Sequence, residues 1–314
     1  SLHKRPMARV IKPLARMGAQ IYGRQQNQKL PITIVPTGKK LQGMCYESPV
    51  ASAQVKSAIL LAGMYAEGDT TVVEPFTSRD HTERMLDAFG VHTEQDGTAV
   101  TIHPVTEFKA PESIEVPGDI SSAAYWLVAG AIVPGSSLLL RNVGINPTRT
   151  GILDVLQDMG ANIELINERT SGGEAAADIR VSYGTLHGVS FGAQIMPRLI
   201  DEIPVIAVAA LFAEGDTVIT GAGELRVKET DRLQAITDQF NKLAPGAIEG
   251  TEDGLVIHGG RSIQPASAFS YDDHRIAMSL AIFGAAGEGV TIENPDCVNI
   301  SYPTFYKTLE ELRK

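Results

Sequence analysis

The stretch DISSAAYWLVAGAIVPGSSLLL, residues 119–140, contains the unit from which the chain is built. It opens with the polar residues Asp119 to Ser122, continues as an apolar run, and reaches a second apolar segment after Pro134 and Gly135. An aspartate ahead of a long apolar run is typical of a capped helix, and a short apolar segment between turn residues is typical of a strand. Residues 119–140 are therefore expected to form a buried helix followed by a strand.

The same pattern recurs elsewhere in the chain. Three further polar openings lead into Ala/Leu/Ile-rich runs that close on glycine: Ser52-Ala53-Gln54-Val55-Lys56-Ser57, Leu199-Ile200-Asp201-Glu202 and Asp272-Asp273-His274-Arg275. Successive openings start about 70 to 80 residues apart, a spacing that indicates stacked structural repeats. A second helix is expected to end near Gly18, Gly90 and Gly160 and to lead into another strand. The repeat reads helix, strand, helix, strand, so the predicted fold class is α/β.

Two regions suggest how the repeats are grouped. Residues 5–21 fit the second helix of a copy whose first half is absent, so we expect residue 1 not to be the natural start. Pro111 and Pro117 interrupt both helices and strand ladders, and the next repeat begins at once. We therefore predict two domains, residues 1–115 with one and a half repeats and residues 116–314 with three.

Composition limits the class of protein. Of the 314 residues, 43% are apolar and 20% are charged, as in ordinary soluble domains. The longest uncharged apolar runs fall short of the roughly 20 residues that a membrane helix needs. The net charge of −10 argues against a nucleic-acid partner. Cys45 and Cys297 match no metal-binding spacing, so we expect no metal site and a reducing, cytoplasmic location.

Charged residues gather where the repeats turn into helices. If residues 226–233 are helical, Lys228 and Arg232 share one face and repel each other unless an anion lies between them. Glu229 beside Lys228 could donate a proton to a bound substrate. The alternative is a solvated face on which Glu229 and Asp231 screen the bases.

His274 and Arg275 stand in the expected first turn of an apolar helix. The helix dipole disfavours cations there, whereas free backbone N–H groups attract an anion, so a bound phosphate or carboxylate would explain both residues. The alternative is that Asp272 or Asp273 merely caps the helix and pairs with Arg275.

Other openings carry groups of the same kind. Asp201 lies among apolar residues that would desolvate it and make it a candidate base, although acids at helix starts are usually caps. Ser52, Gln54 and Lys56 would suit a phosphate at a helix start, or Ser52 is a simple cap. Arg5 and Arg79 also precede expected helices. If these ends converge, they form a cleft for a substrate with several anionic groups.

Several of these runs together resemble the 5-enolpyruvylshikimate-3-phosphate synthase family. Its members catalyse the sixth step of the shikimate pathway, which leads to chorismate and the aromatic amino acids. The runs are Arg5-Pro6-Met7, Ser52-Ala53-Gln54-Val55-Lys56-Ser57-Ala58, Arg79-Asp80-His81-Thr82-Glu83, Asn146-Pro147-Thr148-Arg149-Thr150-Gly151, Leu199-Ile200-Asp201-Glu202, Leu225-Arg226-Val227-Lys228-Glu229-Thr230-Asp231-Arg232 and Asp273-His274-Arg275-Ile276-Ala277-Met278. The likeness covers essentially the whole chain. The Ser-Ala-Gln and Arg-Asp-His-Thr-Glu versions are similar to the bacterial class that tends to tolerate glyphosate.

The resemblance implies a fold and a reaction. The fold would be the enolpyruvyl transferase fold, a two-domain inside-out α/β barrel of βαβαββ repeats, here incomplete at its N-terminus. The 5-hydroxyl of shikimate 3-phosphate would add to C2 of phosphoenolpyruvate while C3 is protonated, and phosphate would leave. The resemblance implies no metal and no organic cofactor, and a monomer with small-molecule substrates only.

The resemblance also assigns roles to individual residues. Asp201 and Glu229 would be catalytic, Asp201 taking the proton of the 5-hydroxyl and Glu229 handling the proton at C3. Shikimate 3-phosphate would be held by Ser52, Ala53 through its backbone, Gln54, Arg79, Asp201 and Lys228. Phosphoenolpyruvate would be held by Arg5, Gln54, Arg232, His274 and Arg275.

Two departures from the family pattern affect these expectations. The N-terminal segment of the family is missing, with a Lys-Ser pair and an arginine that contact both substrates, so we expect this chain alone to have little turnover. Ile300 stands where some members have a further phosphoenolpyruvate-binding lysine. The alternatives are an enolpyruvyl transferase acting on a UDP-sugar, a non-catalytic module that binds phosphorylated metabolites, and a purely structural repeat protein.

Overall fold

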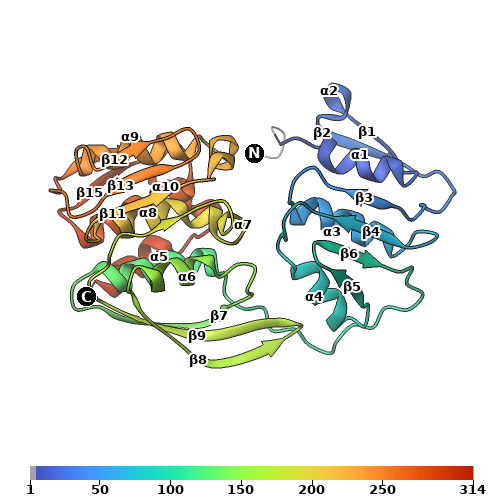
Figure 1. The fold of residues 1–314 in the computed structure, drawn as a ribbon, viewed down its shortest axis with the longest axis horizontal. Coiled ribbons are helices and arrows are strands. Elements are labelled where there is room, and N and C mark those ends of the chain that lie inside the picture. Colours follow the sequence, from blue (N-terminus) through green and yellow to red (C-terminus); the bar gives the residue numbers. More distant parts are fainter. Residues whose placement is uncertain (1–4, 314) are drawn as a thin grey trace. The chain divides into compact units, whose positions relative to one another are not determined.

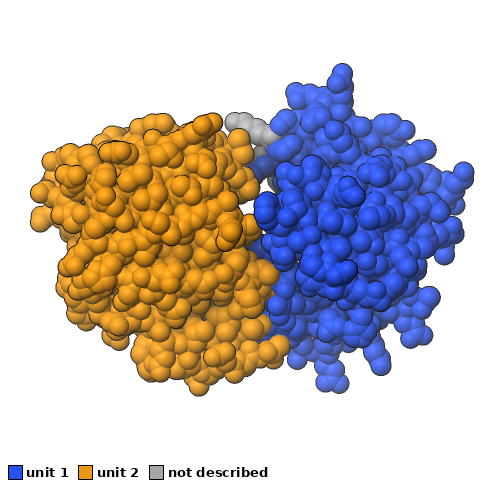
Figure 2. All heavy atoms as spheres, viewed as in Figure 1, with its two compact units in different colours: residues 1–115, 171–174 blue, residues 116–170, 175–314 orange. Residues whose placement is uncertain are grey.

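The computed structural model describes residues 5–313, which form two compact units. Unit 1 contains residues 1–115 and 171–174, and unit 2 contains residues 116–170 and 175–314 (Figure 2). The chain therefore passes from unit 1 to unit 2 after Glu115, and the segment Ser171–Glu174 returns to unit 1. Each unit has its own hydrophobic core.

Three apolar helices form the centre of unit 2 (Figure 1). They are α5 (Ile120–Ile132), α8 (Ile203–Leu211) and α10 (His274–Ala286), and each packs against the other two. Every residue of α8 is buried, as is nearly every residue of α5. Helices that are apolar on all sides belong in an interior, which explains the long Ala/Leu/Ile runs of the sequence.

Three sheets surround these helices in unit 2. Their strands, in spatial order, are β7 (Ser137–Gly144), β9 (Glu174–Ser182) and β8 (Asn162–Ser171); β10 (Ser190–Phe191), β11 (Asp216–Ile219), β13 (Leu255–His258) and β12 (Ile248–Gly250); and β14 (Ala266–Phe269) with β15 (Val290–Glu293). At Gly130 of α5, an added Cβ would lie 2.5 Å from Val181 Cγ1 of β9. Glycine at this position allows the helix to approach the sheet closely.

Further helices connect these strands or follow the last of them. They are α6 (Gly151–Asp158), α7 (Met196–Leu199), η2 (Ile200–Glu202), η3 (Gly223–Val227), α9 (Arg232–Leu243), η4 (Pro295–Ile300) and α11 (Phe305–Leu312). Helix α9 is amphipathic. Its buried face contacts strands β12 and β14, and its polar face remains accessible.

Unit 1 is built in the same way around a smaller core. Its elements are α1 (Ala8–Arg16), β1 (Gln20–Gly23), α2 (Arg24–Asn27), β2 (Lys29–Val35), β3 (Cys45–Glu47), α3 (Ala53–Gly63), β4 (Thr70–Val73), α4 (His81–Ala88), β5 (Thr93–Asp96) and β6 (Ala99–Ile102). Strands β1 and β2 form an antiparallel pair, and the other four strands form a sheet in the order β3-β4-β6-β5.

The two four-stranded sheets have the same connectivity. In β3-β4-β6-β5 and in β10-β11-β13-β12, the first pair is parallel and the remaining pairs are antiparallel. An apolar helix links the two parallel strands, and a second helix precedes the final hairpin. This is the βαβαββ repeat, so the predicted repeat and the mixed α/β class are confirmed.

The polar openings also begin helices as expected. Ser52, Asp119 and Asp273 each accept a hydrogen bond from a backbone N–H of the helix that follows. No helix among residues 5–313 is both long enough and apolar enough to span a lipid bilayer.

Candidate active site

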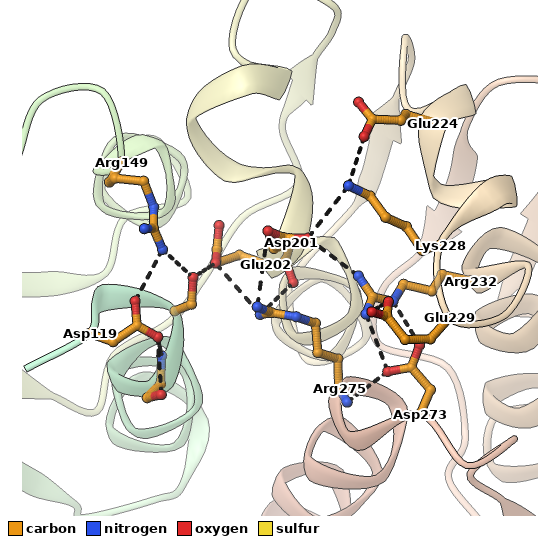
Figure 3. Close-up of polar contacts among 12 residues, drawn as sticks. Asp119, Arg149, Asp201, Glu202, Glu224, Lys228, Glu229, Arg232, Asp273 and Arg275 are labelled. Atoms are coloured by element: carbon orange, nitrogen blue, oxygen red, sulfur yellow. Dashed lines mark hydrogen bonds and ion pairs between the residues drawn. The ribbon is translucent and has the colours of Figure 1, made fainter. Parts of the chain in front are cut away.

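The candidate site residues of unit 2 lie at or just before the starts of three helices. Asp201 and Glu202 lie in η2 just before α8, Arg232 is the first residue of α9, and Arg275 lies in the first turn of α10. Because α8 and α9 both pack against α10, their starts bring these side chains into one cluster (Figure 3). Residues far apart in the sequence thus meet at one end of the helix group.

Arg232 is the centre of this cluster, and its side chain is 1% exposed. Its Nε lies 2.8 Å from Asp273 Oδ2, its Nη2 2.7 Å from Glu229 Oε2, and its Nη1 3.4 Å from Asp201 Oδ1. A guanidinium presents donors in a fixed planar arrangement, so one arginine can orient several carboxylates. Arg232 therefore fixes both predicted catalytic carboxylates relative to each other.

Asp201 is surrounded by cations. Besides Arg232, Lys228 Nζ lies 3.9 Å from Oδ1 and Arg275 Nη2 lies 4.0 Å from Oδ2. The side chain of Asp201 is 18% exposed, so a ligand can reach it. The apolar residues Leu199, Ile200 and Ile203 beside it in the sequence are buried, so the carboxylate is partly desolvated as well as paired with bases.

Lys228 does not lie on a helix. It follows η3, and α9 begins only at Arg232, because Asp231 adopts an extended conformation and caps α9 through Gln234 N at 3.0 Å. The predicted shared helical face of Lys228 and Arg232 is therefore wrong. The two bases nevertheless converge on Asp201, and Lys228 Nζ also lies 2.7 Å from Glu224 Oε1.

At the start of α10, an aspartate caps the helix, and the cationic side chain of Arg275 also lies in its first turn. Asp273 Oδ1 accepts a hydrogen bond from Arg275 N at 2.9 Å, so this aspartate does cap the helix. Its carboxylate pairs with Arg232, however, while Arg275 Nη1 donates to the backbone oxygen of Asp201 at 3.1 Å. Burial, with the nearby charge of Arg275, lowers the pKa of His274, which favours a neutral imidazole beside these cations.

Glu202 is a buried acid that sequence reasoning did not select. It is 1% exposed, accepts a hydrogen bond from Ser121 Oγ, and lies 3.8 Å from Arg275 Nη1. Ser121 Oγ in turn accepts from Arg149 Nη2 at 2.7 Å (Figure 3). Burial raises the pKa of Glu202, an effect that Arg275 and the Ser121 hydrogen bond oppose. The available signal was an acid inside an apolar run next to Asp201.

The remaining predicted site residues lie in unit 1. Ser52 caps α3, with Val55 N 3.5 Å from its Oγ, and Ala53 and Gln54 form the first turn. Gln54 Oε1 accepts from Arg9 Nη2 at 2.7 Å. Arg79 is half-buried in the segment between β4 and α4, and Arg5 is half-buried ahead of α1. Within unit 1, the predicted ligands for shikimate 3-phosphate are thus divided between the start of α3 and the segment after β4.

Lys56 does not have the role that its position at a helix start suggested. Its side chain is 2% exposed and pairs with Glu83 at 2.6 Å and Glu74 at 3.4 Å. A lysine paired with two buried carboxylates is not available to a phosphate at the start of α3, so that expectation was wrong. Within residues 5–313, no group of three or more His, Cys, Asp or Glu side chains could hold a metal ion.

Comparison with known proteins identifies the family. The EPSP synthase (3-phosphoshikimate 1-carboxyvinyltransferase) family model matches residues 1–309. A 3-phosphoshikimate 1-carboxyvinyltransferase from Thermoanaerobacter sp. strain X514 is 51% identical over 99% of this chain and 73% of that protein. EPSP synthase from Acinetobacter baumannii is 44% identical with a TM-score of 0.90, over 99% of this chain and 72% of that one. The enolpyruvyl transferase NikO from Streptomyces tendae is 19% identical with a TM-score of 0.77, covering 98% of this chain and 71% of its own, and shows the fold alone. The chain belongs to the EPSP synthase family.

Proposed function

We propose that this protein transfers the enolpyruvyl group of phosphoenolpyruvate to the 5-hydroxyl of shikimate 3-phosphate and releases phosphate. The observation that carries the proposal is the convergence of Lys228, Arg232 and Arg275 on Asp201, with Glu229 on the same arginine. Family membership supplies the identity of the substrates. The cluster supplies what the reaction needs, namely a carboxylate base, a second carboxyl group and cations for anionic reactants.

The chemistry follows from the roles of these groups. Asp201 accepts the proton of the 5-hydroxyl as its oxygen bonds to C2 of phosphoenolpyruvate, and Glu229 delivers a proton to C3. The resulting tetrahedral intermediate loses a C3 proton and expels phosphate, which takes the electrons of the broken C2–O bond. Lys228 and Arg275 offset the negative charge of the reactants, and fixed charges of this kind supply a large part of catalysis.

Phosphoenolpyruvate is assigned to Arg5, Gln54, Arg232, His274 and Arg275. Arg232 is the least accessible of these, because its guanidinium is shared by Asp201, Glu229 and Asp273. Its main contribution is therefore to hold the two catalytic carboxylates, and Arg275, whose side chain is 17% exposed, is better placed to meet a ligand. Shikimate 3-phosphate is assigned to Ser52, the backbone of Ala53, Gln54, Arg79, Asp201 and Lys228.

Single-turnover product analysis tests the function. Residues 1–314 are used in excess over both substrates, because little turnover is expected of this chain, and the quenched mixture is analysed by mass spectrometry. The proposal predicts an enolpyruvyl ether of shikimate 3-phosphate and one phosphate per ether, with UDP-sugars inactive as acceptors. Product from a UDP-sugar instead, or no product together with no calorimetric binding of shikimate 3-phosphate, would refute it.

We also propose the organisation and setting of the protein. Residues 1–115 and 116–314 serve as its two domains, with one and a half and three repeats, and the protein is a cytoplasmic monomer. The division of the chain after Glu115 supports the first statement. Light scattering tests the second: a mass close to 33.6 kDa is expected, and twice that value would contradict it.

A further inference from the structure

A buried ion cluster lies directly behind the start of α3. Lys56, Glu74 and Glu83 are its members, and Lys56 Nζ is 2.6 Å from Glu83 Oε1 and 3.4 Å from Glu74 Oε2. The side chains of Lys56 and Glu74 are each 2% exposed. One cation thus faces two carboxylates in the interior of unit 1, and Glu83 Oε2 is buried with no hydrogen-bond partner among the described residues.

Stability alone does not account for this cluster. Buried ion pairs are often no more stable than apolar side chains of the same size, because the charges lose their hydration. Within the cluster, the charge of one lysine offsets only one of the two carboxylates. At least one of the acids is therefore expected to have another task.

Glu74 makes contacts that Glu83 does not. Glu74 Oε1 accepts a hydrogen bond from Ser52 N at 2.7 Å, and Glu74 Oε2 accepts from Ser78 Oγ at 2.7 Å and from Ser78 N at 3.4 Å. Ser52 caps α3 immediately before Ala53 and Gln54, and Ser78 immediately precedes Arg79. One carboxylate therefore connects the two segments of unit 1 that carry ligands assigned to shikimate 3-phosphate.

We propose that Glu74 is a positioning residue that holds the start of α3 and the segment before α4 at the separation required to bind the phosphate of shikimate 3-phosphate. The inference rests on the proposed function and deepens it. Donors fixed before the ligand arrives lose less conformational entropy on binding, so a rigid connection between the two segments raises affinity. Lys56 acts as the counter-ion that allows Glu74 to remain charged in the interior.

The two glutamates provide a matched pair of variants. Glu74→Gln keeps the shape of the side chain, but an amide has a single acceptor oxygen, so its two ends cannot accept from both Ser52 N and Ser78 N. Glu83→Gln removes the same charge from the same lysine and leaves a one-to-one pair of Lys56 with Glu74. Because ion pairing with Lys56 is altered in both variants, only the contacts to the two segments separate them.

The experiment measures calorimetric affinity for shikimate 3-phosphate and amide hydrogen exchange of Ser52 in residues 1–314. Glu74→Gln is expected to weaken binding by about tenfold or more, as is typical for loss of a hydrogen bond to a charged group, and to accelerate exchange at Ser52. Glu83→Gln is expected to stay within about twofold of the native chain in both measurements.

The outcomes separate the inference from the function it rests on. If the native chain binds shikimate 3-phosphate and the two variants weaken that binding equally, the cluster only stabilises unit 1 and the inference is wrong. Unchanged affinity in Glu74→Gln would overturn it as well, even if exchange at Ser52 were faster. Unaltered amide exchange at Ser52 in Glu74→Gln would show that Glu74 does not hold the segments. If the native chain itself does not bind shikimate 3-phosphate, the proposed function fails.

Discussion

Replacement of Arg232 by methionine removes the guanidinium that three carboxylates share, and the expected result is a large loss of stability in unit 2. The Arg232–Asp273 pair decides the magnitude, because its atoms are 2.8 Å apart and the two side chains are 1% and 0% exposed. Removing one partner of such a pair leaves an uncompensated buried charge and costs about 3–5 kcal/mol. For a unit of this size, that corresponds to a fall in Tm of roughly 6 to 20 °C. The contact with Glu229 adds little, since that carboxylate is 30% exposed and well screened.

Arg180→Met is the matched control, because Arg180 pairs with Glu164 at 2.6 Å on the surface of the same unit, where the side chains are 50% and 59% exposed. Its expected cost is below about 1 kcal/mol. Urea unfolding and calorimetry of both variants provide the comparison. Equal stabilities of the two variants would refute this reasoning.

Three further results are expected. Asp201→Ala and Glu229→Gln should each slow product formation in single turnovers by about 10²–10⁴-fold with the fold retained, and native rates in both would contradict their assignment. Burial raises the pKa of Glu202 above its ordinary value of 4.5, so protonated Glu202 stabilises the native state below pH 4.5 and this stabilisation is lost as the pH rises. The native chain should therefore lose stability relative to Glu202→Gln between acidic and neutral pH. A difference in unfolding free energy that stays constant with pH, measured by urea unfolding, would contradict this expectation. In an NMR titration His274 should titrate below pH 6.5 and His258, hydrogen-bonded to Asp216, above it; the reverse order would be inconsistent with the burial of His274.

The repeats could be predicted from the sequence because each depends on local patterns. A long apolar run such as residues 123–133 is stable only in a protein interior. The aspartates Asp119 and Asp273 mark where α5 and α10 begin, because each caps the helix that follows it. The converging helix starts then bring Asp201, Arg232 and Arg275 together.

The contacts of individual charges could not be predicted in the same way. Lys56 was expected near a ligand, but its partners Glu74 and Glu83 come from a strand end and another helix, and no local pattern reveals that they meet it in the interior. Lys228 was expected on a helix because the spacing of charges was considered without the cap at Asp231, which starts α9 later. The importance of Glu202 depends on Ser121 and Arg149, which lie in other segments of unit 2.

Isotope incorporation tests the central claim, enolpyruvyl transfer with protonation at C3, most directly. A single turnover of residues 1–314 with phosphoenolpyruvate and shikimate 3-phosphate in D₂O should give an enolpyruvyl ether that carries deuterium in its vinyl CH₂ group, because a methyl group forms from solvent and then loses one hydrogen. The same reaction with Glu229→Gln should give far less of this ether. Release of phosphate with pyruvate and no ether, or an ether without deuterium, would contradict the account.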